Sequence, residues 1–108
     1  MEPASSISAV ELRASCADAS PPASLAAFSH AGLLKAMWLA ERGHWDAAHA
    51  IAQDDDSEDG SWVHAYLHRV EGDLSNAGYW YGRAGRPRCE AELAQEWDDV
   101  VTALLGRT

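Results

Sequence analysis

The stretch Ser61–Pro87, SWVHAYLHRVEGDLSNAGYWYGRAGRP, predicts a hairpin of two helices around which the rest of the chain is organised. The first helix is expected over about Ser61–Glu71, and the second ends at about Ala84. Four residues that cap or stop helices set these limits, in the order Gly72, Asp73, Gly85 and Pro87. The stretch is therefore read as two helices joined by a tight turn.

Each helix of this hairpin carries an apolar stripe that should face the core. In the first helix the apolar residues recur with a 3.6-residue period: Trp62, Val63, Tyr66, Leu67 and Val70. In the second helix the corresponding residues are Ala77, Trp80, Tyr81 and Ala84. Together with the last helix of the chain, these stripes predict six largely buried residues: Trp62, Tyr66, Trp80, Tyr81, Leu93 and Trp97.

A different face of the first helix carries polar residues suited to chemistry. His64, His68 and Glu71 fall roughly 140° round the helix from the apolar stripe. Histidines at i and i+4 can chelate a divalent metal, with Glu71, or His49 from the preceding hairpin, completing the site. The same residues suit acid–base catalysis, because histidine titrates near neutrality. HxxxH without the Glu of HExxH is more often a pair of hydrogen-bonding histidines, so metal is the weaker alternative.

The other side of the second helix supplies further candidates for ligand contact. Asn76, Tyr79 and Arg83 lie off the predicted core face and can donate hydrogen bonds. The alternative is that all three are simply exposed to solvent. The sequence contains no cofactor motif, so no cofactor is expected.

An acidic segment, Asp54–Gly60, is predicted to be a loop between two hairpins. Its alternating oxygen-bearing residues imitate the first half of an EF-hand calcium loop. The twelfth position of such a loop would be Tyr66 in place of the bidentate Glu. The segment is therefore interpreted as a solvated connector that caps the next helix.

The length and charge of the chain limit its function. A chain of 108 residues is expected to form one domain, and eight basic against seventeen acidic residues give a net charge of -9. This acidic character makes nucleic acid and membrane surfaces improbable partners. The two cysteines show no metal or disulfide spacing, and no signal peptide or membrane span is apparent, so a cytoplasmic protein is expected.

The remaining chain also reads as helical. Residues 1–24 are expected to form a weakly helical segment capped at Ser5 or Ser6, and residues 25–108 a single helical domain. Helices are predicted over about 25–42, with Gly32 as a break, over 45–53 and over 89–105. No stretch alternates like a strand, so the predicted fold is all-α, with five or six helices.

An internal repeat with an offset of 29 residues pairs Gly43 with Gly72 and Ala48 with Ala77, which predicts two hairpins of one pattern. The pattern resembles tetratricopeptide (TPR) repeats and, more closely, Sel1-like repeats, whose second helix carries A-x-x-W-Y-x-[K/R]-A. Here these residues are Ala77, Trp80, Tyr81, Arg83 and Ala84. The segment AHAIAQ that ends at Gln53, followed by GSWVHAYLHRVEGDLSNAGYWYGRAGRP, also resembles a family of short bacterial proteins with no assigned activity.

Two functions are compatible with these features. The resemblance to helical repeats implies an interaction module that binds a protein or peptide through a concave face. The alternative is a small-molecule or metal-binding site, possibly catalytic, built on His64, His68 and Glu71. Convergence of these three side chains would favour the site, whereas side chains directed apart into solvent would favour the module.

Overall fold

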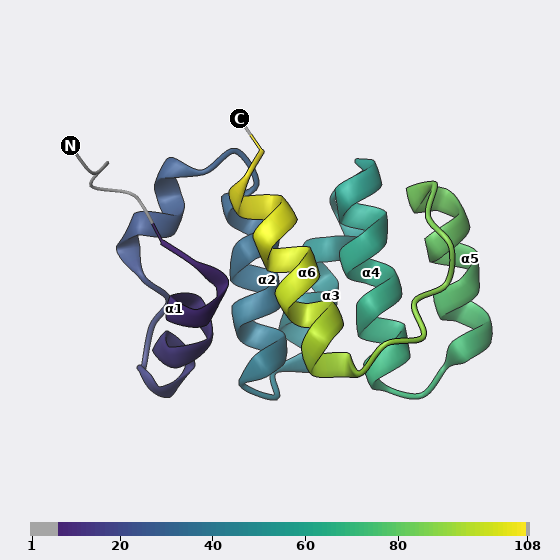
Figure 1. The fold of residues 1–108 in the computed structure, drawn as a ribbon, viewed down its shortest axis with the longest axis horizontal. Coiled ribbons are helices and arrows are strands. Elements are labelled where there is room, and N and C mark those ends of the chain that lie inside the picture. Colours follow the sequence, from purple (N-terminus) through teal and green to yellow (C-terminus); the bar gives the residue numbers. More distant parts are fainter. Residues whose placement is uncertain (1–6, 108) are drawn as a thin grey trace.

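Six α-helices and two short 3₁₀ helices make up residues 7–107, the part of the chain that a computed structural model describes (Figure 1). No strand occurs in this range, which confirms the predicted all-α fold. No helix in it is long and apolar enough to cross a membrane. The α-helices are α1 (Ala9–Ala14), α2 (Ala31–Glu41), α3 (Trp45–Gln53), α4 (Glu58–Val70), α5 (Leu74–Ala84) and α6 (Leu93–Leu105).

Two helical hairpins, α2 with α3 and α4 with α5, form the body of the molecule. Each hairpin turns at a glycine with positive φ, at 84° for Gly43 and 88° for Gly72, a conformation that costs a residue without Cβ little. The Asp73 side chain accepts a hydrogen bond from the backbone N–H of Asn76 and so caps α5. Gly85 ends α5 in the left-handed conformation, so the predicted limits of this hairpin are largely confirmed.

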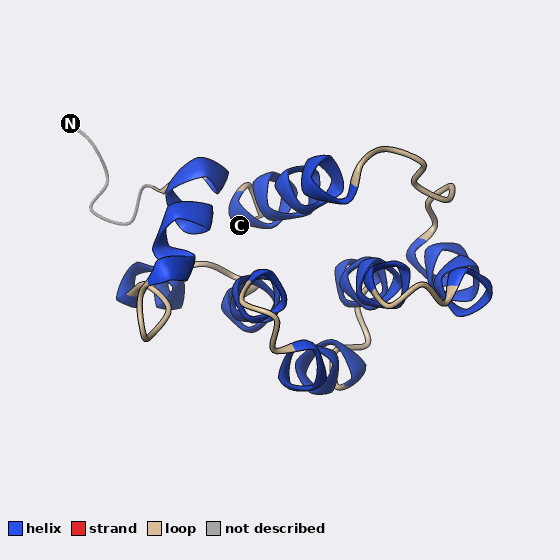
Figure 2. Ribbon diagram, turned by 90° about the horizontal axis from the view of Figure 1, so that it is seen from below, coloured by secondary structure: helices blue, strands red, loops and turns tan. Residues whose placement is uncertain are grey.

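Helix α6 packs across the two hairpins and contacts the first helix of each, α2 and α4. Figure 2 shows that α2 to α5 follow an arc and that α6 lies on its inner side. Trp97 of α6 is fully buried and donates a hydrogen bond from Nε1 to the Met37 carbonyl oxygen of α2 at 2.9 Å. Helix α1 packs against α2 and α6 and buries Leu12. The core thus lies between the arc and the terminal helices.

Several predicted helix limits differ from those observed. Helix α4 begins at Glu58, because Ser57 accepts a hydrogen bond from the Gly60 N–H, so the predicted loop is shorter at its end. Helix α6 begins at Leu93, four residues later than predicted, and leaves an irregular connection over residues 86–92. The predicted helix over 25–42 is divided into a 3₁₀ turn and α2, with the division before Gly32. Ser8 caps α1, and the predicted caps Ser5 and Ser6 lie outside the described residues.

Four of the six residues predicted to be buried are buried: Trp62, Tyr66, Tyr81 and Trp97. Leu93 is wrongly predicted, since its exposed fraction is 38% at the first residue of α6. Trp80 is only half-buried, because one ring face packs on His64 while Arg83 lies near the ring. Val70, at the last position of α4, is also exposed.

Candidate metal centre

Helix α4 holds the two histidines of the candidate site and is surrounded by other helices. It contacts α2, α3, α5 and α6, and nearly every residue from Gly60 to His68 is buried. His64 and His68 have exposed fractions of only 4% and 6%. The two histidines are not directed into solvent, because α3 and α5 cover the face of α4 on which they lie.

Three histidines converge in this region, His49 from α3 with His64 and His68 from α4. The Nε2 atoms of His49 and His64 are 2.9 Å apart, a hydrogen-bond distance. One ring nitrogen from each of the three histidines lies within 4.8 Å of the other two. His64 and His68, one turn apart on α4, are thus joined by His49 from the other hairpin.

Tryptophan rings hold two of the three imidazoles in place. Trp45 stacks on His49, one turn along α3, with ring centroids 4.7 Å apart. Trp45 also donates a hydrogen bond from Nε1 to the Leu67 carbonyl oxygen at 2.7 Å, which ties α3 to α4. Trp80 of α5 stacks on His64 with centroids 3.9 Å apart. Both rings restrict imidazole rotation, a role that the sequence analysis, which placed Trp80 in the core, did not foresee.

Glu71 contacts the third histidine. Its Oε2 lies 2.7 Å from Nδ1 of His68, so Nδ1–H donates to the carboxylate. This hydrogen bond places the free electron pair of His68 on Nε2, the arrangement in which metal-binding histidines are commonly held by a carboxylate behind the ring. Glu71 and the exposed Asp73 also form a second group of possible ligands with His68, which the sequence analysis did not identify.

Burial favours the neutral imidazole at His64 and His49. Desolvation, followed by the charges that His49 and His68 would carry, lowers the pKa of His64 from 6.5 to about 4. Desolvation and then the neighbouring His68 also lower the pKa of His49. Neutral imidazole is the form that binds metal ions, so at neutral pH protons compete weakly for these two nitrogens.

The remaining candidate residues lie outside this cluster. Asn76 is exposed and takes part, through its backbone, in the cap of α5. Tyr79 is exposed and accepts a hydrogen bond from Arg83 at 3.2 Å. The Arg83 guanidinium lies 5.5 Å from the centre of the Trp80 ring, on the residue that covers His64. Tyr79 and Arg83 therefore border the centre from outside, and Asn76 has no contact with it.

The acidic segment before α4 uses its oxygen atoms for local hydrogen bonds. Asp55 accepts hydrogen bonds from the backbone N–H and the hydroxyl of Ser57. Ser57 in turn caps α4. These contacts fit the capping interpretation that the sequence favoured over calcium binding.

Comparison with known proteins supplies no relative: no protein family, curated protein or solved structure matches this chain. The chemistry of the centre therefore has to be argued from its own geometry. That geometry consists of three clustered imidazoles, one carboxylate behind them and two indole walls.

Proposed function

We propose that this protein binds a divalent transition-metal ion of the zinc class through His49, His64 and His68. The observation that carries the proposal is the meeting of three imidazole nitrogens, from two hairpins, within 4.8 Å of one another. Imidazole suits zinc, nickel and copper, whereas magnesium and calcium prefer oxygen ligands. The donor set therefore selects the transition-metal class.

The spacing of one pair of ring nitrogens, in His49 and His64, is close to what an ion requires. Nitrogen ligands at 2.0–2.1 Å from a tetrahedral zinc ion are about 3.3 Å apart. The Nε2 atoms of His49 and His64 are 2.9 Å apart, so a few tenths of an ångström of ring movement opens this pair. In the metal-free protein one of these two Nε2 atoms carries the proton of their hydrogen bond. For both to bind an ion, that proton must move to Nδ1 of the same ring. Three protein ligands leave a fourth position, which water fills in comparable sites.

The surroundings of the ligands support the same function. Trp45 and Trp80 limit the rotation of His49 and His64, and Glu71 orients His68. Ligands held in place in this way lose less conformational freedom on binding. Carboxylates in this position typically raise metal affinity by about 10- to 100-fold.

The first test is a titration of the metal-free protein with zinc and with cobalt. We expect one ion per chain, and visible absorption bands from tetrahedral cobalt. Substituting His49→Gln, His64→Gln or His68→Gln should each abolish the bands, and Glu71→Gln should lower affinity by roughly 10-fold or more. His44→Gln is the matched control, because His44 is exposed and lies outside the cluster.

Two results would overturn the proposal. One is zinc affinity in the triple variant of His49, His64 and His68 equal to that of the parent. The other is an equal loss of affinity from His44→Gln, which would place the ion elsewhere. Circular dichroism of each variant separates loss of the site from loss of the fold.

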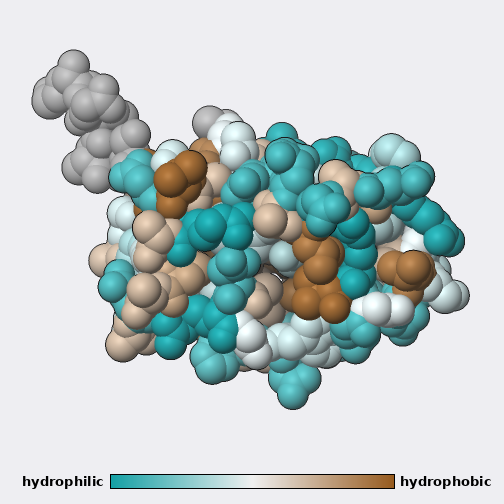
Figure 3. Space-filling model, turned by 60° about the horizontal axis from the view of Figure 1, so that its bottom comes forward, coloured by the Kyte–Doolittle hydropathy of each residue, from teal (hydrophilic) through white to brown (hydrophobic). Residues whose placement is uncertain are grey.

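The interaction module would need a free concave face, and within residues 7–107 that face is partly occupied. The inner side of the arc, where repeat proteins bind peptides, is partly covered by α6. On the face shown in Figure 3, hydrophobic surface forms small separate patches within a largely hydrophilic surround. Binding of a protein or peptide stays a prediction, and the buried histidine cluster favours the metal centre over it.

A further inference from the structure

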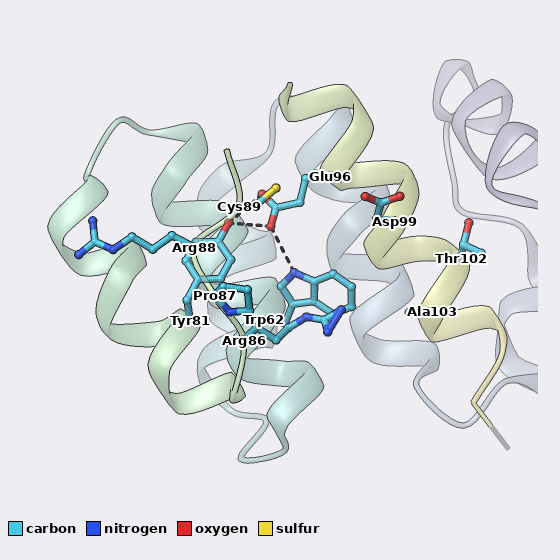
Figure 4. A pocket seen from close by; sticks show the side chains of 10 residues that line it. All are labelled: Trp62, Tyr81, Arg86, Pro87, Arg88, Cys89, Glu96, Asp99, Thr102 and Ala103. Carbon is cyan, nitrogen blue, oxygen red and sulfur yellow. Dashed lines mark hydrogen bonds between the residues drawn. The ribbon is translucent and has the colours of Figure 1, made fainter. Parts of the chain in front are cut away.

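A second potential site lies between α4, α5, the connection 86–92 and α6. It is a cavity of about 590 Å³ (Figure 4). Small-molecule sites commonly have volumes in this range. Its walls are the rings of Trp62 and Tyr81, the residues Pro87 and Cys89, and one face of α6 that includes Ala103. None of the three histidines lines it.

Two charged residues at this cavity, Glu96 and Arg86, differ in whether another group of the protein compensates their charge. Glu96 has an exposed fraction of 1% and accepts hydrogen bonds from Trp62 Nε1, from Tyr81 OH and, as an ion pair, from Arg69. Its charge is therefore compensated within the protein. Arg86 lies across the cavity wall with its guanidinium carbon only 3.5 Å from the centre of the Trp62 ring.

Arg86 is exposed and forms no ion pair within the described residues, although its charge acts on Asp59. Within residues 7–107, five arginines bond an acidic side chain, a carbonyl or a hydroxyl group: Arg13, Arg42, Arg69, Arg83 and Arg107. Arg86 and Arg88 make no such contact in this range. Arg88 also lines the cavity, but its guanidinium packs over Gly78 of α5, whereas the Arg86 guanidinium lies on the Trp62 ring (Figure 4).

We propose that the cavity binds a small organic anion, with its acidic group on Arg86 and an apolar body against Trp62, Pro87 and Ala103. Stacking on the indole fixes the plane of the guanidinium and leaves the N–H donors at its edge free for a carboxylate or a phosphate ester. Because the Glu96 carboxylate is paired with Arg69, it offers little repulsion to such a ligand. Asp99 and Thr102 lie on the α6 wall, and the Asp99 carboxylate disfavours an acidic group there, so the acidic group of the ligand is placed on Arg86 instead.

The test uses three ring compounds that differ in their polar group: benzoate, phenyl phosphate and the neutral benzamide. Each is titrated into the full chain in a buffer with chelator, which separates this site from the metal centre, and amide and indole resonances are followed by NMR. We expect saturable shifts at the Trp62 indole and the Cys89 amide with an anion, and binding of benzamide weaker by roughly 10-fold or more. The tighter of the two anions identifies the acidic group.

Arg86→Gln should weaken binding of that anion by roughly 10-fold or more, and Arg86→Lys by less, because lysine keeps the charge but loses the fork. Arg83→Gln is the matched control, since Arg83 is also an exposed arginine near a tryptophan on the same hairpin but lies outside the cavity. Equal binding of benzamide, unchanged binding in Arg86→Gln, or no shift up to about 10 mM ligand overturns the proposal.

Discussion

Two buried polar residues show how single side chains adapt to the interior of this protein. The buried Glu96 carboxylate forms an ion pair with Arg69 and accepts hydrogen bonds from two further donors, Trp62 and Tyr81. Burial and the hydrogen bond to Glu96 raise the pKa of Tyr81, so this hydroxyl stays a donor. His64 has no acidic partner and is instead held neutral among other rings. The same physical cost of burying charge is thus met by pairing in one case and by loss of the charge in the other.

The neutral state of His64 predicts a specific dependence of stability on pH. In the unfolded chain His64 takes up a proton as pH falls below 6.5, whereas in the fold it does so only near pH 4. The contribution of His64 to the free energy of unfolding is therefore constant above pH 6.5. It falls by on the order of 3 kcal/mol as the pH is lowered from 6.5 to 4. The measurement is urea unfolding of metal-free protein across this range.

His64→Gln is the control for this loss, because glutamine does not titrate and the carboxylates remain. The difference between parent and variant should shrink toward low pH as the parent loses its advantage. A difference that stays the same from pH 7 to pH 4 would mean that His64 titrates in the fold as it does in the unfolded chain.

At the scale of helices, glycines inside α4 and α5 occupy unlike surroundings. A Cβ on Gly60, in the first turn of α4, would overlap the backbone carbonyl oxygen and the side chain of Asp55. A Cβ on Gly82, in α5, would meet no atom within 4 Å. Gly60 therefore allows the chain before α4 to pass close to the helix, whereas Gly82 serves no visible packing purpose.

These surroundings predict opposite effects for one substitution. Gly82→Ala should stabilise the protein by up to about 1 kcal/mol, because alanine is the better helix former at an exposed position. Gly60→Ala should destabilise it by about 1–3 kcal/mol, because the backbone at Asp55 must move to make room for the added Cβ. Urea unfolding of the two variants measures both, and equal effects of the same sign would contradict the packing described.

At the scale of the whole molecule, α6 joins elements that are far apart in the sequence. It contacts α1, α2 and α4, and its residue Trp97 reaches the backbone of α2. Its apolar residues Val100, Val101 and Leu104 are fully buried. The helix is therefore part of the core that unites both hairpins.

This position predicts that Trp97 matters more for stability than Trp80. Trp97→Ala should cost about 3–5 kcal/mol, because it leaves a cavity and removes the hydrogen bond that joins α6 to the Met37 carbonyl oxygen. Trp80→Ala should cost less, about 1–2 kcal/mol, since the ring is only half-buried. Chemical denaturation of both variants checks the order, and a larger loss for Trp80 would show that the His64 stack contributes more than burial indicates.

The sequence by itself determined the helical hairpins. Apolar periodicity, the cap at Asp73 and the glycines at 43, 72 and 85 act between residues close in the chain, so their effects can be read from spacing. The spacing of His64 and His68 likewise placed both imidazoles on one side of α4. The spacing did not show that His49 joins this site, because that depends on how the two hairpins pack together.

Only the tertiary structure decided which faces are covered. The polar face of α4 is buried because α3 and α5 pack on it, and Glu96 is buried because Arg69, Trp62 and Tyr81 come to it from α4 and α5. Leu93 is exposed although its spacing places it on the same face of α6 as the fully buried Trp97. A helical pattern states which residues share a face, whereas contacts between residues distant in the chain decide what that face meets.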